Sequence, residues 1–389
     1  MSYNLWVDCP KVPITELLSF IVDNRGKTVP TAEHGHKLIA TNCVTNSTLF
    51  PVYEKVRYLS DETYKTWFRA HPQPGDILFV NKGTPGRVCM VPNPVDFCIA
   101  QDMIALRADD RKIYNKYLFA VLRSNIIQQQ IYNTNVGDVI PHFKKQFMSQ
   151  LLIPVPERHV QEFIGDFYYV LSYKMEHNQK INENLERQAQ AIFESWFTVK
   201  REINGCLADI CQYSKEKVAV SLLDLESYYS TENMLPGKAG ATQAASLPTT
   251  TQTTKCNVGD VLVSNIRPYF KKIVYCHTDC GCSTDVLCFV PKKHKLSAYL
   301  FFLLYADSFF DFMVAGSKGT KMPRGDKQQI MMYPVYVPSD EELAGFNDIA
   351  QPVLKQIQLN CEENKRLIAL RDTLLPKLMA GEIEMAGEL

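Results

Sequence analysis

Two stretches of the chain, at about 157–197 and 339–379, carry apolar residues at alternating spacings of three and four. This spacing places them on one face of an α-helix and is typical of a heptad seam between two helices. Such a stretch would rise about 60 Å as a helix, which is longer than a small domain is wide. The pattern therefore favours a pair of long helices over a single amphipathic helix lying on a domain.

The two predicted helices match position by position at an offset of 182 residues, as from Ile164 to Phe346. The predicted seam comprises Ile164, Phe167, Leu171, Asn178, Ile181, Leu185 and Ile192, with Phe346, Ile349, Val353, Asn360, Leu367, Leu370 and Leu374. Because the chain must return after its second half, antiparallel pairing is expected, with Asn178 near Asn360. We hypothesise that these two asparagines fix the register, as a buried seam Asn does in coiled coils.

The rest of the chain is also duplicated. Ordered matches at offsets from 184 down to 182 residues join Gly75-Asp76-Ile77-Leu78 to Gly259-Asp260-Val261-Leu262, Tyr117-Leu118-Phe119 to Tyr299-Leu300-Phe301, and Ile153-Pro154-Val155-Pro156 to Val335-Tyr336-Val337-Pro338. An ordered series with so little drift predicts a tandem repeat.

Each half is expected to fold as a mixed α/β domain. Short apolar runs alternate with helical stretches such as Tyr114–Tyr132 and Leu296–Val314. The predicted fold class is mixed α/β, with two duplicated domains separated by two long antiparallel coiled-coil helices about a pseudo-two-fold axis. The expected limits are 1–156 for the first domain, 157–200 for the central helix, 201–338 for the second domain and 339–389 for the C-terminal helix and tail.

The amino-acid composition adds little to the predicted fold and function. The 389 residues include 42 basic and 42 acidic side chains, so any surface for nucleic acid must come from local clustering. Twelve cysteines without a secretory signal indicate reduced thiols in a cytoplasmic protein, with no membrane span expected. The cluster from Cys276 to Cys282 is crowded into one short hairpin, so no metal site is predicted there.

Glycine- and asparagine-rich basic loops recur in both halves and are the candidate DNA contacts. Lys and Arg there can bind phosphates, and Asn and Arg can make paired hydrogen bonds to base edges. The candidates in the first half are Arg25, Lys27, Thr28, Asn81, Lys82, Arg87, Asn133, Asn135, His142, Lys144 and Lys145. Those in the second half are Asn265, Arg267, Tyr269, Lys271, Lys272, Lys318, Lys321, Arg324 and Lys327.

No enzyme motif accompanies these loops. The sequence has no phosphate-binding Gly-x-x-x-x-Gly-Lys-Ser/Thr loop, no Asn/Asp-Pro-Pro-Tyr string and no Gly-x-Ser-x-Gly. No catalytic residue is predicted, and a self-contained nuclease or methyltransferase would leave the repeat unexplained.

Both long stretches carry recognisable strings. The segment from Leu370 to Met379 followed by Gly381-Glu382-Ile383, and the segment from Asn184 to Phe197, resemble the helix signatures of type I restriction-modification specificity subunits. The resemblance implies two target recognition domains, and helices that dock modification and restriction subunits. It also implies that S-adenosylmethionine, ATP and Mg belong to those partners, and that this chain holds no cofactor.

The expected function is thus sequence-specific reading of a two-part, asymmetric site on double-stranded DNA. The alternative is a coiled-coil protein adaptor, or an inactive copy without specific DNA binding. The heptads alone permit the alternative, whereas the duplicated basic loops favour DNA.

Overall fold

The computed structural model describes residues 4–24, 28–134, 141–199 and 201–383. The chain divides into two compact units, Met1–Gln179 with Glu362–Leu389 (unit 1) and Lys180–Cys361 (unit 2). Each unit combines one globular domain with part of each long helix, a grouping that the sequence did not indicate. The domain limits expected from the sequence stay a prediction.

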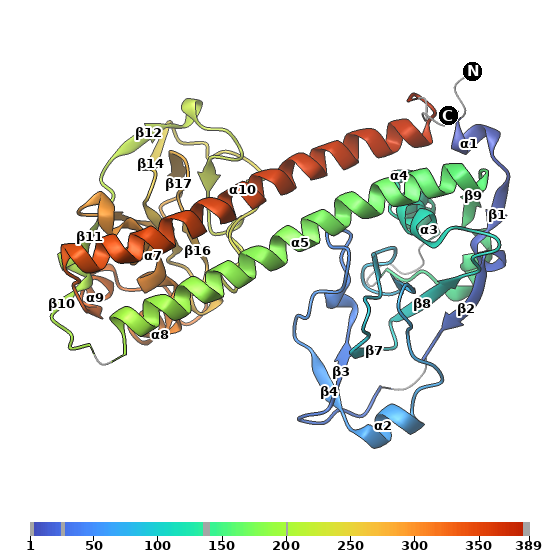
Figure 1. The fold of residues 1–389 in the computed structure, drawn as a ribbon, viewed down its shortest axis with the longest axis horizontal. Helices are drawn as coiled ribbons and strands as arrows, with labels where there is room; N and C mark the ends of the chain where they lie inside the picture. Colours follow the sequence, from blue (N-terminus) through green and yellow to red (C-terminus); the bar gives the residue numbers. More distant parts are fainter. Residues whose placement is uncertain (1–3, 25–27, 135–140, 200, 384–389) are drawn as a thin grey trace. The chain divides into compact units, whose positions relative to one another are not determined.

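The two long helices are confirmed as α5 (Arg158–Phe197) and α10 (Asp340–Met379), each of 40 residues (Figure 1). A capping box starts α10. The Ser339 hydroxyl accepts a hydrogen bond from the Glu342 amide at 3.3 Å, and the Glu342 carboxylate accepts one from the Ser339 amide at 2.8 Å. These bonds satisfy amides that have no partner within the helix.

The helices run antiparallel within each unit, as predicted. In unit 1, the Asn364 amide group donates to the Met175 carbonyl at 3.2 Å, and Arg371 lies over the ring of Tyr168. Higher numbers on α10 therefore meet lower numbers on α5. Unit 2 shows the same sense, because Asn182 bonds Ile357 while Trp196 lies close to Gly345.

Both asparagines of the predicted helix seam are buried, each in a polar layer of its own unit. Asn178 in unit 1 is 1% exposed and donates to Glu363 at 2.7 Å and Asn364 at 2.8 Å. Asn360 in unit 2 is 6% exposed and donates to Asn182 at 2.7 Å. The two asparagines thus bond different partners. Their role in register stays a hypothesis.

Parts of the predicted helix seam are exposed. Ile181, Ile349 and Leu370 expose 42%, 36% and 43% of their surface. The buried stripe instead follows residues that face a domain as well as the other helix, such as Phe193 and Phe346, whose ring centroids lie 5.8 Å apart in the unit 2 core. A heptad pattern locates a helix pair but does not separate helix–helix from helix–domain burial.

Unit 1 contains a four-stranded antiparallel sheet in the order β2-β8-β5-β6, a three-stranded sheet in the order β4-β3-β7, and the antiparallel pair β1-β9. Its strands are β1 (Lys11–Pro13), β2 (Leu18–Val22), β3 (His36–Ile39), β4 (Arg57–Leu59), β5 (Ile77–Val80), β6 (Val88–Met90), β7 (Phe97–Ile99), β8 (Met103–Ala108) and β9 (Leu152–Pro154). Its shorter helices are α1 (Leu5–Asp8), α2 (Asp61–Thr66), α3 (Asn115–Leu122), α4 (Asn125–Asn133) and the 3-10 turns η1 (Ile14–Glu16), η2 (Thr41–Cys43) and η3 (Lys145–Gln150).

Unit 2 repeats this plan with the sheet β11-β18-β15-β16, a second sheet β12-β14-β17-β13 and the pair β10-β19. Its strands are β10 (Gly205–Cys206), β11 (Cys211–Tyr213), β12 (Lys217–Ala219), β13 (Tyr228–Tyr229), β14 (Gln252–Cys256), β15 (Val261–Ser264), β16 (Ile273–Tyr275), β17 (Cys280–Cys282), β18 (Val286–Pro291) and β19 (Pro334–Val335). Its shorter helices are α6 (Leu207–Ile210), α7 (Ser297–Tyr305), α8 (Asp307–Ala315), α9 (Lys327–Met331) and the turns η4 (Val220–Leu222), η5 (Pro268–Phe270) and η6 (His294–Leu296).

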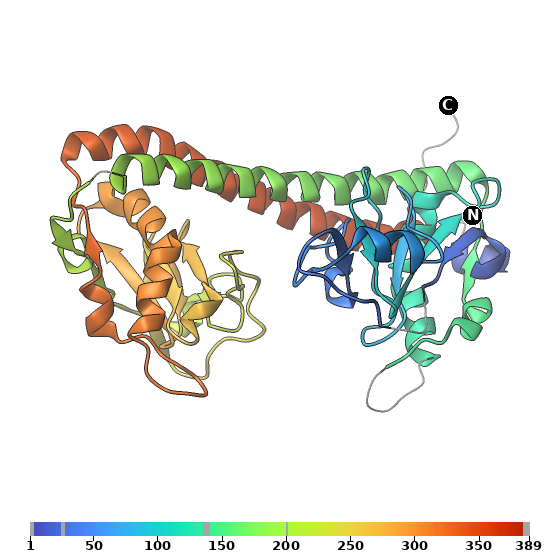
Figure 2. The ribbon, with the colours of Figure 1, turned by 90° about the horizontal axis from the view of Figure 1, so that it is seen from below.

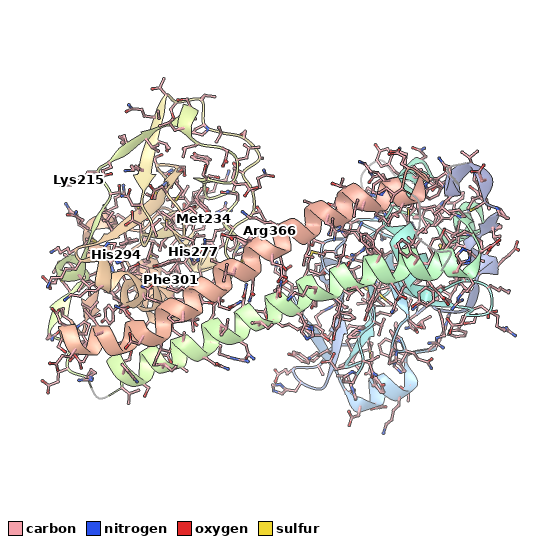
Figure 3. The ribbon with its side chains drawn as sticks, turned by 45° about the horizontal axis from the view of Figure 1, so that its top comes forward. Lys215, Met234, His277, His294, Phe301 and Arg366 are labelled. Carbon is pink, nitrogen blue, oxygen red and sulfur yellow. The ribbon has the colours of Figure 1, made fainter. Side chains whose placement is uncertain are left out.

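The central strand of each unit is buried on both faces. Alternate side chains of a strand point to opposite faces, so Ile77 and Phe79 of β5 join the helix-side core, whereas Leu78 and Val80 join the core against the second sheet. In unit 2, α7 and α8 cover one face of the sheet (Figure 2). Met234, labelled in Figure 3, belongs to the core on the other face. The expected mixed α/β repeat is confirmed.

One polar contact recurs at equivalent positions of the two cores. The hydroxyl of Tyr117 donates to the Pro154 carbonyl at 2.9 Å, and the hydroxyl of Tyr299 donates to the Tyr336 carbonyl. Both pairs tie the first α-helix after the main sheet to the segment just before the long helix.

Among the described residues, no single helix is long and apolar enough to span a membrane, and the one helix pair that reaches that length together is bent by 67°.

Gly165 of α5 is required by close packing. A Cβ at this position would lie 2.6 Å from the backbone nitrogen of Tyr117 and 3.0 Å from the carbonyl carbon of Lys116. Backbone atoms cannot rotate away, so we expect Gly165→Ala to cost about 1–3 kcal/mol, as overpacking does, and to lower the melting temperature by several degrees. Differential scanning calorimetry measures this.

The control is Gly345→Ala on α10, where a Cβ would lie 3.4 Å from the Trp196 ring. Alanine favours a helix over glycine, so this variant is expected to melt at the same temperature or slightly higher. Equal melting temperatures for the Gly165 variant and the parent chain would contradict the packing argument.

Glu186 of α5 makes the stability of unit 2 depend on pH. Burial raises the pKa of its carboxyl from 4.5 to about 6, although the Tyr305 hydroxyl donates to it at 3.0 Å. Because the folded pKa lies above the unfolded one, ionisation destabilises the fold by up to about 2 kcal/mol, a loss that develops as pH rises from 4.5 through 6. Glu186→Gln should therefore raise the melting temperature at pH 8 and leave it nearly unchanged at pH 4.5. Glu194→Gln, at an exposed position of the same helix, serves as the control.

Candidate nucleic-acid interface

In unit 1, the loop that follows β5 is joined to the segment that precedes η3. The Gly83 amide donates to the Pro141 carbonyl at 2.9 Å, and the Phe143 amide donates to the Asn81 carbonyl at 2.8 Å. Lys82 and His142 form an isolated β-bridge between these bonds. We call this pairing of residues 81–87 with 141–145 the unit 1 seam.

Unit 2 has the same backbone pairing, formed by residues with different side chains. The Arg267 amide donates to the Pro323 carbonyl at 2.8 Å, and the Gly325 amide donates to the Asn265 carbonyl at 3.2 Å. Ile266 and Arg324 form the corresponding bridge. Residues 265–272 with 323–327 are the unit 2 seam, so the duplication extends to the loops at the end of the central strand.

The unit 1 seam and the unit 2 seam, together called the loop seams, each begin with an asparagine. Asn81 and Asn265 are both 7% exposed, and the side-chain oxygen of each is buried without a hydrogen-bond partner in the described part of the chain. A buried carboxamide oxygen is costly when unpaired, and in native proteins such an atom usually bonds protein, water or ligand. The matched positions make these two oxygens candidate acceptors at the interface.

Several candidate cations are already paired with carboxylates. Lys145 bonds Asp23 at 2.9 Å, and Lys318 bonds Asp326 at 2.6 Å. Arg324 pairs with Asp285 at 2.9 Å. These pairs reduce the charge that the side chains can offer to a phosphate.

Other candidates present their charge to solvent. Lys82, Arg87, Lys144, Lys321 and Lys327 are exposed, and within the described ranges none of their side-chain nitrogens has a hydrogen-bond or ion-pair partner in the structure. All five belong to a loop seam or to the segment next to it. They are therefore the stronger candidates for phosphate contacts.

Four further predicted residues, Thr28, Asn133, His142 and Lys272, lie in the described part of the chain. Thr28 is exposed, His142 is half-buried, and Asn133 accepts a hydrogen bond from Gln129 at the end of α4. Lys272 donates to the Thr231 carbonyl at 2.6 Å, and burial lowers the pKa of its ammonium group. Arg25, Lys27 and Asn135 lie outside the described residues.

Sequence reasoning missed two residues at the unit 2 seam. Phe270 is 39% exposed beside Tyr269, and its position in the same basic loop could have indicated it. Lys238 comes from a separate loop and shares the carboxylate of Asp307 with Lys271, at 2.7 and 2.9 Å. No sequence pattern links Lys238 to this loop, because only the fold brings them together.

The cysteines of unit 2 form part of its core. Cys256, Cys276, Cys280, Cys282 and Cys288 are each at most 3% exposed and pack between the two sheets. Within the described ranges, no group of three or more His, Cys, Asp or Glu side chains could hold a metal ion. These thiols pack as small apolar side chains do.

A family model described as "Type I restriction modification DNA specificity domain" matches residues 29–187. The chain is 29% identical over 128 residues to the type I restriction enzyme HindI specificity subunit of Haemophilus influenzae, and 24% identical over 123 residues to the MjaIX specificity subunit of Methanocaldococcus jannaschii. Each of these matches spans 32% of this chain and 28% of the relative.

A solved structure resembles the whole fold. The S subunit of a type I restriction-modification system from M. genitalium covers 97% of this chain, and 96% of that subunit is covered, with a TM-score of 0.59 and 16% sequence identity. At this identity, the likeness concerns the fold alone. The chain is thus similar in sequence to type I restriction-modification specificity subunits over residues 29–187, and the fold of one such subunit extends over nearly the whole chain.

Proposed function

We propose that this chain is the non-catalytic subunit that reads the DNA sequence for a type I restriction-modification complex. The observation that carries the proposal is the duplicated loop seam. Both units pair the same two segments by the same backbone bonds, yet one seam presents Lys82-Gly83-Thr84-Pro85-Gly86 and the other Ile266-Arg267-Pro268-Tyr269-Phe270. Two loops that share a backbone pairing but carry different side chains are suited to a target made of two unlike half-sites.

The long helices supply the surface for protein partners. On unit 1, α5 exposes Phe163, Val170 and Tyr173 by 43%, 59% and 42%. Exposed apolar side chains along one helix are characteristic of a docking surface. We assign this face to the modification subunits, with restriction subunits joining the same complex in the cytoplasm. S-adenosylmethionine, ATP and Mg then belong to those partners.

Methylation mapping tests this function. DNA from cells that co-express the chain with its modification partner is sequenced by a single-molecule method that detects methyladenine. A two-part asymmetric motif, methylated in each half, is expected. If the complex assembles and no new motif appears, the chain is an adaptor or an inactive copy, and the DNA-reading function is wrong.

A further inference from the structure

Two aromatic side chains project from the tip of the unit 2 seam. Tyr269 and Phe270 of η5 are 50% and 39% exposed, and their ring centroids lie 4.7 Å apart at an angle of 53°. The equivalent positions of the unit 1 seam, 184 residues earlier, are Pro85 and Gly86. Tyr269 and Phe270, here called the aromatic tip, are therefore not needed for the backbone pairing, since unit 1 forms the same pairing without them.

The backbone on both sides of this tip is strained. Arg267 has φ 49° and Lys271 has φ 51°, in the left-handed region that residues other than glycine seldom occupy. Unit 1 has Gly83 at the position equivalent to Arg267, with φ 87°. Strained backbone at non-glycine residues persists where its surroundings hold it, and such strain concentrates at functional sites.

Neighbouring segments hold the tip on several sides. The Gly237 amide donates to the Phe270 carbonyl at 2.8 Å, and the Lys238 amide donates to the Lys271 carbonyl at 2.8 Å. The ammonium groups of Lys238 and Lys271 both reach Asp307 of α8, at 2.7 and 2.9 Å. A loop backbone held in this way loses little conformational freedom when it binds a partner.

Basic side chains lie on the same loop as the two rings. The Lys272 ammonium group lies 5.9 Å from the centroid of the Phe270 ring, and Arg267 and Lys271 flank η5 in sequence. Exposed rings on a basic loop match a partner that presents flat apolar faces between anions. Stacked bases flanked by phosphates have this chemistry, and proteins that distort duplexes insert apolar side chains at base steps.

We propose that Tyr269 and Phe270 insert against a base step within the half-site contacted by unit 2, and that they open that step. The unit 1 seam does not open a base step in this way, because Pro85 and Gly86 offer no ring. The inference rests on the proposed DNA-reading function and adds to it a distortion confined to one half of the target.

The test uses the full chain in complex with its modification partner and duplexes carrying the mapped methylation motif. 2-Aminopurine is placed in turn at each step of both halves, and its fluorescence is recorded with and without protein. Because the modification subunit turns its target adenine out of the duplex, a rise is expected at the methylated position of each half. A further rise of several-fold is expected at one other step of the unit 2 half and at no other step of the unit 1 half. Tyr269→Ala with Phe270→Ala should abolish this further rise and weaken binding by about 10- to 1000-fold, as expected for loss of base stacking.

Two further variants test whether the effect comes from the aromatic ring itself or from loss of positive charge. Tyr269→Phe keeps the ring and should keep the fluorescence signal. Lys321→Ala removes an exposed cation of unit 2, and should weaken binding without changing the signal at the opened step.

The outcomes distinguish failure of the DNA-reading function from failure of base-step opening by Tyr269 and Phe270. If no motif is mapped and no duplex binds, the DNA-reading function fails. If the complex binds its motif but the double alanine variant leaves fluorescence and affinity unchanged, only the inference is wrong. Loss of assembly with the modification subunit, at unchanged DNA affinity, would identify the aromatic tip as a protein contact and would likewise overturn the inference.

Discussion

Replacing residues 1–156 with the equivalent segment of a type I specificity subunit is expected, under the proposed function, to change one half of the methylated motif completely and to leave the other half as it was. The reason is that each unit has its own cores and its own loop seam, with no segment of the unit 2 seam drawn from residues 1–156. Methylation mapping of cells carrying the chimera measures the result. The converse exchange of residues 201–338 should change only the other half.

The exchange succeeds only if the incoming segment fits α5. Tyr114 donates to Asp166 at 2.8 Å, and Lys116 pairs with the same carboxylate at 2.7 Å. The backbone of Tyr117 also lies against Gly165, where a Cβ would be 2.6 Å away. The test therefore requires a chimera that keeps Tyr114, Lys116 and Tyr117, and its melting temperature is the control. A change in both halves of the motif, in a chimera that folds, would contradict independent reading by the two units.

Much of the fold could be predicted because the hydrophobic patterns, which are weak in either half alone, recur at matching positions in both halves. The helix pair followed from heptads that match at Ile164 and Phe346, and the mixed domains followed from apolar runs such as Ile77–Val80. Burial along the helices could not be predicted in detail. Ile181 and Leu370 satisfy the heptad yet are 42% and 43% exposed, because each helix faces a domain as well as its partner helix.

The candidate interface could be predicted only as far as its loops. Asn81 and Asn265 were both candidates from the sequence, but their burial depends on the backbone bonds to Phe143 and Gly325. The pairing of Lys145 with Asp23 joins residues 122 apart in the chain, and no local pattern indicates it. Counting loop lysines in the sequence therefore overestimates the positive charge available to DNA, because carboxylates in the folded chain pair with some of them.

DNA affinity should fall steeply with salt, by an amount that the exposed cations set. If Lys82, Arg87, Lys144, Lys321 and Lys327 each neutralise one phosphate, the logarithm of affinity has a slope of about −4.5 against the logarithm of salt concentration. Raising salt from 50 to 200 mM would then weaken binding by about 500-fold. Titrations of the mapped duplex by fluorescence anisotropy, at several salt concentrations, measure the slope.

Single variants divide the loop lysines into two classes. Lys82→Ala or Lys321→Ala should reduce the steepness of the slope by about 1, because one phosphate contact is lost. Lys145→Ala should leave the slope nearly unchanged, because Asp23, which is 7% exposed, already compensates the Lys145 charge at 2.9 Å. The same variant should lower the melting temperature, since it removes the ion pair between Lys145 and the buried Asp23 carboxylate. If Lys145→Ala flattens the slope as much as Lys82→Ala does, then Lys145 exchanges Asp23 for a phosphate on binding, and the division of cations by their ion pairs is wrong.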